Sequence, residues 1–127
     1  MDACPICDRG EPLDVIAELA ATWATAAAEA PLPGYVCVVS KRHVVEPFEL
    51  PPAELAAFWR ESMLIARAVA GLLQPAKMNY EIHGNTIPHL HMHLYPRLPG
   101  DPGIGAASFS RSRDEIDRLA AAIAAAR

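Results

Sequence analysis

Three histidines, His89, His91 and His93, alternate with Leu90 and Met92. Because successive side chains of a strand point to opposite faces, this spacing predicts three imidazoles on one face, about 6.6–7 Å apart. Such imidazoles could share one catalytic metal ion. Alternatively, one of them is a nucleophile. A neutral ring whose Nδ1–H is held by a backbone carbonyl presents an Nε2 lone pair that can attack phosphorus, while a neighbour binds the phosphate or protonates the leaving group. The spacing alone is compatible with both chemistries.

A second group with metal-ligand character is the pair Cys4 and Cys7, which has the short CxxC spacing of zinc ligands. A redox dithiol is the alternative, but that motif prefers a helix start after a strand, and no such strand precedes this pair. A structural zinc site would be tetrahedral and would need two more ligands. His43 and one histidine of the run at 89–93 are the candidates. Cys37 lies inside an apolar run and is expected to be a buried hydrophobe.

The histidine run is expected to form one strand of an antiparallel hairpin. Residues 78–83 also alternate, with apolar side chains at 78, 80 and 82. The short loop 84–88, which contains Gly, Asn and Pro, joins the two alternating runs, as in a hairpin. The polar face of this hairpin would bring Asn79, Glu81 and His83 together with the three later histidines.

Other elements must support this hairpin. The β-branched run 35–39 predicts a buried strand. Apolar residues at three- and four-residue steps predict a long amphipathic helix over about 52–74, and capping-box spacing predicts a C-terminal helix over about 112–126. Prolines and glycines in 96–110 indicate an irregular loop. The alanine-rich segment 14–29 favours helix by propensity, although its first residues could equally open a strand.

Length and composition limit the classes of protein to consider. The chain has 127 residues, of which 52% are hydrophobic, and a net charge of -4. We therefore expect a single domain over 1–127, with an N-terminal knuckle at 1–10 and a loop and helix at 98–127. The acidic balance argues against a general nucleic-acid binder. No apolar stretch reaches the length of a membrane span, and no secretory signal pattern opens the sequence, so a cytoplasmic location is expected.

Local positive charge could still attract a small phosphorylated ligand. Lys41, Arg42 and Arg97 are available for this role, although most such side chains are simply solvated.

Several motifs in a fixed order resemble the histidine-triad (HIT) family, in particular its zinc-bearing bacterial-type branch. The run from His89 to Tyr95, followed by Pro96 and Arg97, is similar to the family signature. The segment 33–43 is similar to the family's Pro-Gly strand that ends in a Lys-x-His motif. Together with the CxxC pair and the intervening helix, the resemblance covers roughly residues 4–97.

The resemblance implies an α+β fold with an antiparallel sheet, in which Val15–Leu19 is a strand, and usually a homodimer. It implies a small nucleotide as substrate, either a phosphate ester or a phosphoramidate, for example an adenylyl conjugate or a dinucleoside polyphosphate. His91 would be the nucleophile that forms a nucleotidyl-histidine intermediate, and His93 would contact the phosphate or serve the leaving group. The resemblance also implies a structural zinc ion with four ligands. These are Cys4, Cys7, His43 and His89.

The chain departs from the family pattern in three places. Gly84–Ile87 replaces the usual Gly-Gln-Ser/Thr-Val, although Asn85 and Thr86 could still offer an amide and a hydroxyl to phosphate oxygens. The shorter loop leaves either Asn79 or Asn85 as the phosphate-site amide. Tyr35 stands where the family has histidine after the Pro-Gly. His83 has no counterpart and is expected to be a surface histidine rather than part of the site.

Three other functions remain compatible with these residues. A nucleotidyltransferase or phosphorylase would use the same first step with an acceptor other than water. A zinc-dependent metallohydrolase would use the three histidines to hold a metal-bound water. A regulatory nucleotide-binding protein would bind nucleotide tightly but would lose no turnover on substitution of His91.

Overall fold

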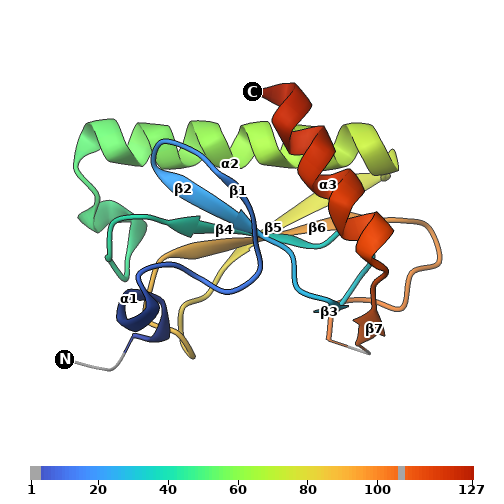
Figure 1. Ribbon diagram of the computed structural model, residues 1–127, viewed down its shortest axis with the longest axis horizontal. Coiled ribbons are helices and arrows are strands. Elements are labelled where there is room, and N and C mark those ends of the chain that lie inside the picture. The colour runs from blue at the N-terminus through green and yellow to red at the C-terminus, as the bar shows by residue number, and fades with distance from the viewer. Residues whose placement is uncertain (1–3, 106–107) are drawn as a thin grey trace.

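The computed structural model describes residues 4–105 and 108–127 and contains a five-stranded antiparallel sheet (Figure 1). The strands lie in the order β1-β2-β4-β6-β5. This confirms the predicted α+β class with an antiparallel sheet. The strand bounds are β1 Val15–Glu18, β2 Thr22–Thr25, β4 Val36–Ser40, β5 Lys77–Ile82 and β6 His91–Arg97.

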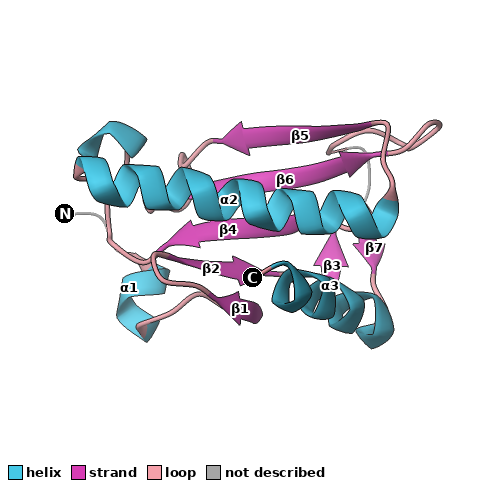
Figure 2. Ribbon diagram, turned by 90° about the horizontal axis from the view of Figure 1, so that it is seen from above, coloured by secondary structure: helices cyan, strands magenta, loops and turns pink. Residues whose placement is uncertain are grey.

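Helix α2, Pro52–Leu73, lies along one face of this sheet, as Figure 2 shows from above. Its buried side chains include Phe58, Ile65 and Val69, which pack with Met92 of β6 in the main core. The helix begins at a proline and ends at Leu73, before a left-handed Gln74. The predicted helix over about 52–74 is therefore confirmed.

Two shorter helices complete the described fold. Helix α3, Arg113–Ala126, packs against α2 and β1, and the Ser112 hydroxyl accepts a hydrogen bond from the Glu115 N–H, as predicted for the N-terminus of this helix. Helix α1, Pro5–Arg9, lies on the side of the sheet opposite α2 (Figure 1). A single 3-10 turn spans Pro47–Glu49. Among the described helices, none combines the length and apolarity that crossing a membrane requires.

The alanine-rich segment 14–29 forms strands rather than the helix that propensity favours. The strand implied at Val15–Leu19 is present as β1, but β2 was not predicted. Tertiary contacts explain the outcome. Strand β2 pairs with β1 on one side and β4 on the other, and the buried Thr22 hydroxyl donates a 2.6 Å hydrogen bond to Glu61 of α2. Such contacts outweigh the few tenths of a kcal/mol per residue that propensity supplies.

The loop predicted at 96–110 is only partly irregular. Its first two residues, Pro96 and Arg97, end β6, and Phe109–Ser110 forms a short strand, β7, that pairs with β3, Glu29–Ala30. Arg111 fixes this corner, because its buried guanidinium donates hydrogen bonds to backbone carbonyl oxygens, including a 2.7 Å bond to that of Tyr35.

The Pro-Gly turn before β4 requires glycine for two reasons. Gly34 has φ of +78°, and a Cβ atom there would lie 2.0 Å from Leu73 Cδ1. The Gly34 N–H donates a 3.1 Å hydrogen bond to the Glu115 carboxylate, which thereby stabilises the turn. The turn thereby delivers Tyr35 to the start of β4 in a fixed position.

Candidate active site

The face of the sheet opposite α2 carries the polar side chains of the predicted hairpin. Strands β5 and β6 pair antiparallel, with Glu81 opposite His93, which confirms the hairpin. Met92 and Leu94 face α2 in the core, so the alternating His91 and His93 face the other way. A pocket of about 440 Å³ opens on this side. It is lined by His83, Gly84, Asn85, Thr86, Ile87, His91 and His93.

His91 is oriented by the backbone. Its Nδ1 lies 2.6 Å from the carbonyl oxygen of His89. A carbonyl can only accept a hydrogen bond, so Nδ1 carries a proton and Nε2 of the neutral ring is a lone pair. The half-buried ring lines the pocket. This is the arrangement that a nucleophilic imidazole needs.

His93 stands beside His91, with the two ring centroids 4.8 Å apart. Burial, together with the neighbouring His91 and His83, lowers the pKa of His93 to about 4, against the opposing effect of Glu81. The ring is therefore neutral at neutral pH. The Tyr35 hydroxyl lies 2.6 Å from its Nδ1. Burial also raises the pKa of Tyr35, so the phenol keeps its proton.

Leu90, Met92 and Leu94 all lie in the main core, so His89 lies on the same side of the sheet as His91 and His93, as predicted, but it contributes to a different site. Strand β6 begins only at His91, and the ring of His89 is fully buried on the side of the CxxC pair. Its Nε2 lies 2.6 Å from the Ser40 carbonyl oxygen, and its Nδ1 lies 3.5 Å from Cys4 Sγ. His89 therefore groups with Cys4, Cys7 and His43, whereas His91 and His93 belong to a separate group of side chains. The interpretation of three histidines around one catalytic metal is therefore wrong.

Cys4, Cys7, His43 and His89 converge, with one ligand atom of each lying within 4.8 Å of all the others. The Nδ1 atoms of His43 and His89 are 3.1 Å apart, and Cys7 Sγ lies 3.2 and 3.7 Å from them. Tetrahedral zinc with ordinary bond lengths would place two nitrogens about 3.3 Å apart and a nitrogen and a sulfur about 3.6 Å apart. The donor set and its spacing therefore fit zinc.

Electrostatics at the cysteine pair also favour a cation. Desolvation raises the pKa of the Cys7 thiol, and so do the hydrogen bond and charge of Cys4. Two thiolates held this close need positive charge between them. Burial lowers the pKa of His89, and its Nε2–H is held by the Ser40 carbonyl, so Nδ1 faces the two sulfurs as a lone pair. Histidines that bind metals commonly donate their other ring N–H in this way.

The two asparagine candidates occupy different places. Asn85 and Thr86 line the pocket with His91 and His93. Asn79 lies on the same face of β5 but accepts a 3.0 Å hydrogen bond from Arg97, and it is not among the pocket-lining residues. Geometry thus favours Asn85 as the phosphate-site amide. His83, expected at the surface, is indeed exposed, yet it lines the pocket as well.

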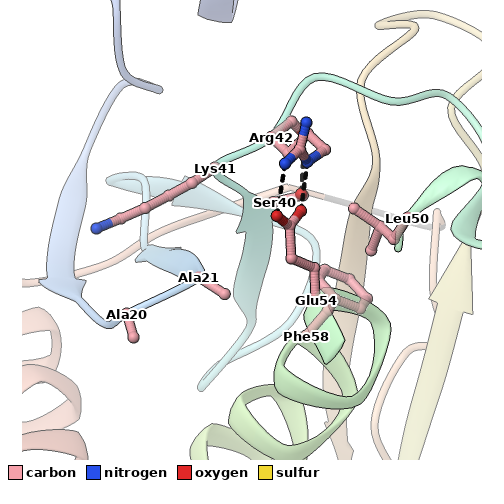
Figure 3. Close-up of a pocket in the computed structure, with 8 residues that line it drawn as sticks. All are labelled: Ala20, Ala21, Ser40, Lys41, Arg42, Leu50, Glu54 and Phe58. Atoms are coloured by element: carbon pink, nitrogen blue, oxygen red, sulfur yellow. Dashed lines mark hydrogen bonds and ion pairs between the residues drawn. The ribbon is translucent and has the colours of Figure 1, made fainter. Parts of the chain in front are cut away.

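The three cations considered for ligand attraction are each paired with a carboxylate. Lys41 bonds to Glu18, Arg42 to Glu54 and Arg97 to Asp101. Figure 3 shows Lys41 and Arg42 at a second hollow of about 390 Å³, which lies between the end of β4 and the start of α2. Lys41 and Arg42 both line this hollow, but Lys41 is paired with Glu18 and the Arg42 guanidinium with Glu54. The histidine pocket is the better candidate active site because it alone of the two is lined by imidazoles, one of which presents an Nε2 lone pair.

Comparison with known proteins identifies relatives that are similar to this chain in sequence and in structure. A curated relative, bis(5'-nucleosyl)-tetraphosphatase [asymmetrical] of Schizosaccharomyces pombe, is 29% identical over 75 residues, 55% of this chain. The match spans only 41% of that relative's length. A histidine triad protein of Sinorhizobium meliloti has a similar structure, with a TM-score of 0.79 and 25% identity over 90% of this chain and 89% of that one.

A further solved structure carries metal. The Zn-bound histidine triad family protein of Mycobacterium smegmatis matches with a TM-score of 0.74 and 25% identity, over 97% of this chain and 94% of that one. The family model of the HIT domain matches residues 9–100, most of the chain. The triad at the pocket, the fold and these matches agree, and this chain belongs to the histidine-triad (HIT) family.

Proposed function

We propose that this protein hydrolyses nucleotide phosphate esters or phosphoramidates through a covalent intermediate on His91. The observation that carries the proposal is the hydrogen bond from His91 Nδ1–H to the His89 carbonyl, which leaves Nε2 as a lone pair in the pocket. The relative named bis(5'-nucleosyl)-tetraphosphatase supports a dinucleoside polyphosphate as substrate.

In the first step, the His91 Nε2 lone pair attacks the α-phosphorus in line, and the bond from phosphorus to the leaving group breaks. In the second step, water attacks the same phosphorus and returns the electron pair to Nε2. Asn85 and Thr86 supply polar groups at the pocket wall that can donate to phosphate oxygens. A transferase would share the first step and differ only in the acceptor.

We assign His93 the role of a neutral hydrogen-bond donor to the phosphate. The Tyr35 phenol donates to Nδ1 of His93, so the single proton of the neutral ring resides on Nε2. The low pKa of His93, about 4, keeps the ring in this neutral form during catalysis at neutral pH.

The variant Tyr35→Phe tests whether the Tyr35 hydroxyl sets the tautomer and the protonation state of His93. A hydrogen bond to Nδ1 stabilises the neutral form, so its loss should raise the pKa of His93. The rise should be modest, since a neutral hydrogen bond is worth about 1 kcal/mol. We expect kcat to fall about tenfold, because part of the population now carries its proton on Nδ1. ¹⁵N NMR titration checks both pKa and tautomer, and a wild-type spectrum with Nδ1–H on His93 would contradict the assignment.

We also propose that Cys4, Cys7, His43 and His89 hold a structural zinc ion. The fit of the four ligand atoms to tetrahedral spacing and the zinc-bound relative support this proposal. When bound, zinc supplies a cross-link between the N-terminal segment and the sheet. His89 thereby holds its own carbonyl in place for His91.

Mass spectrometry of protein quenched during turnover tests the nucleophile. Full-length protein is mixed with adenosine 5'-(4-nitrophenyl) phosphate, quenched in base to preserve phosphorus–nitrogen bonds, and digested. We expect the mass of one adenylyl group on the peptide that contains His91. Turnover in the absence of any such adduct, in wild type and in His93→Ala alike, would overturn the proposal.

A further inference from the structure

We propose that His83, hydrogen-bonded to Glu81, is the proton donor and acceptor for the chemistry at His91. This inference rests on the proposed function and adds to it a catalytic residue for which the sequence predicted only a surface position. Its role would be to protonate the leaving group in the first step and to deprotonate water in the second.

His83 directly follows strand β5 and lines the pocket, and Glu81, near the end of that strand, lies beside it. Glu81 and His83 follow the alternation of the strand, and Glu81 lies opposite His93 in the register. His83 Nε2 lies 2.8 Å from Glu81 Oε1, and the ring centroids of His83 and His93 are 5.6 Å apart. The side chain of His83 lines the pocket and is 58% exposed, which leaves it accessible to a leaving group and to water.

The other two imidazoles of the pocket already have different roles in the proposed mechanism. His91 gives its Nε2 lone pair to phosphorus, and its Nδ1 is held by a carbonyl. His93 is neutral, with a pKa of about 4, and proton loss from a neutral imidazole would leave an unfavourable imidazolate. Among the described residues that line the pocket, His83 is the remaining imidazole.

Glu81 gives His83 the property that a general acid and base needs. A carboxylate that accepts a hydrogen bond from one ring nitrogen stabilises the protonated ring and leaves Nδ1 to exchange a proton with the substrate. The titratable groups that face His83 are Glu81, whose carboxylate is hydrogen-bonded to its ring, and the pocket histidines His91 and His93, of which His93 has a lowered pKa.

His83, hydrogen-bonded to Glu81, accounts for the proton transfer in each of the two steps. As the His91 Nε2–phosphorus bond forms and the leaving-group bond breaks, the Nδ1 proton of protonated His83 moves to the leaving atom. Neutral His83 then removes a proton from the attacking water as the oxygen–phosphorus bond forms. The phosphorus–nitrogen bond breaks, and both histidines return to their starting states.

A pair of substrates tests the proposal. In adenosine 5'-(4-nitrophenyl) phosphate the leaving group needs no proton, whereas in an alkylamine adenosine 5'-phosphoramidate it does. For His83→Gln we expect the burst of nitrophenol to stay within about threefold of wild type, followed by accumulation of the adduct on His91. Formation of the adduct from the phosphoramidate should slow by about 10²-fold or more, the usual size of acid catalysis.

Two further variants sharpen the experiment. Glu81→Gln keeps the hydrogen-bond geometry without the charge and should slow the phosphoramidate reaction about tenfold. Tyr80 lies on the opposite face of the same strand. The control variant Tyr80→Phe should therefore leave the reaction rates with both substrates unchanged. Equal slowing of both substrates in His83→Gln, or no slowing of either, would overturn the role of His83. Absence of the His91 adduct in wild type would instead overturn the proposed function.

Discussion

Replacing His91 with asparagine is expected to lower the rate of adenylyl-substrate hydrolysis by at least about 10³-fold, equivalent to about 4 kcal/mol of barrier. Asparagine keeps a polar side chain of similar size but offers no basic nitrogen lone pair to phosphorus. The His89 carbonyl and the rest of the pocket wall stay in place. Affinity for a nucleoside monophosphate should therefore change by only a few-fold.

Steady-state kinetics and equilibrium binding on the same preparations check this expectation, with Tyr80→Phe as the matched control. A loss confined to kcat, with binding preserved and the adenylyl adduct absent, is the expected pattern for a nucleophile. If His91→Asn binds nucleotide tightly and loses no turnover beyond background, the protein is a regulatory nucleotide-binding protein rather than a hydrolase.

Replacing Cys4 with serine is expected to release zinc and to lower the melting temperature by roughly 10 °C or more. Structural zinc sites contribute folding free energy directly, and a few kcal/mol corresponds to a shift of this size in a domain of this length. The cluster joins α1, the end of β4 and the residue before β6, so its loss releases three segments together. Activity should fall as well, because the carbonyl that orients His91 belongs to a ligand residue.

Elemental analysis and thermal melting on carefully purified protein measure both effects. The matched control is Cys37→Ala, which removes a buried thiol whose pKa burial raises to about 12 and which lies outside the four-residue cluster. That variant should retain one equivalent of zinc. Less than about half an equivalent in wild type, or full zinc in Cys4→Ser, would count against the four-ligand site.

Patterns with a clear period predicted the elements on which the site is built. The stripe of α2 and the cap at Ser112 depend on local spacing, so the sequence alone located both helices. The alternation in β5 and β6 likewise predicted the hairpin and brought Glu81 and His83 to the same face as His91 and His93.

The features that the sequence did not predict have a common physical cause. Each of them depends on contacts with residues that are far away in the sequence. Strand β2 owes its conformation to pairing on both edges and to Glu61, none of which local alanine content reveals. Strand β7 exists only because Glu29–Ala30 lies beside it. Alternation alone placed His89 beside His91 and His93, but its contact with Cys4 and Cys7 depends on where α1 lies. The unusual Tyr35 was noted in the sequence, but its bond to His93 follows from the register of β4 and β6.

The hydrogen bond that orients His91 comes from the main chain at position 89. A peptide carbonyl is present whatever side chain its residue carries, so no point substitution at that position deletes the acceptor. Loss of the metal ligand at position 89 therefore acts on His91 only indirectly, through the position of the backbone. The tautomer of His91 is lost only if the segment around position 89 moves. The chemistry at His91 therefore depends on how firmly that backbone segment is held.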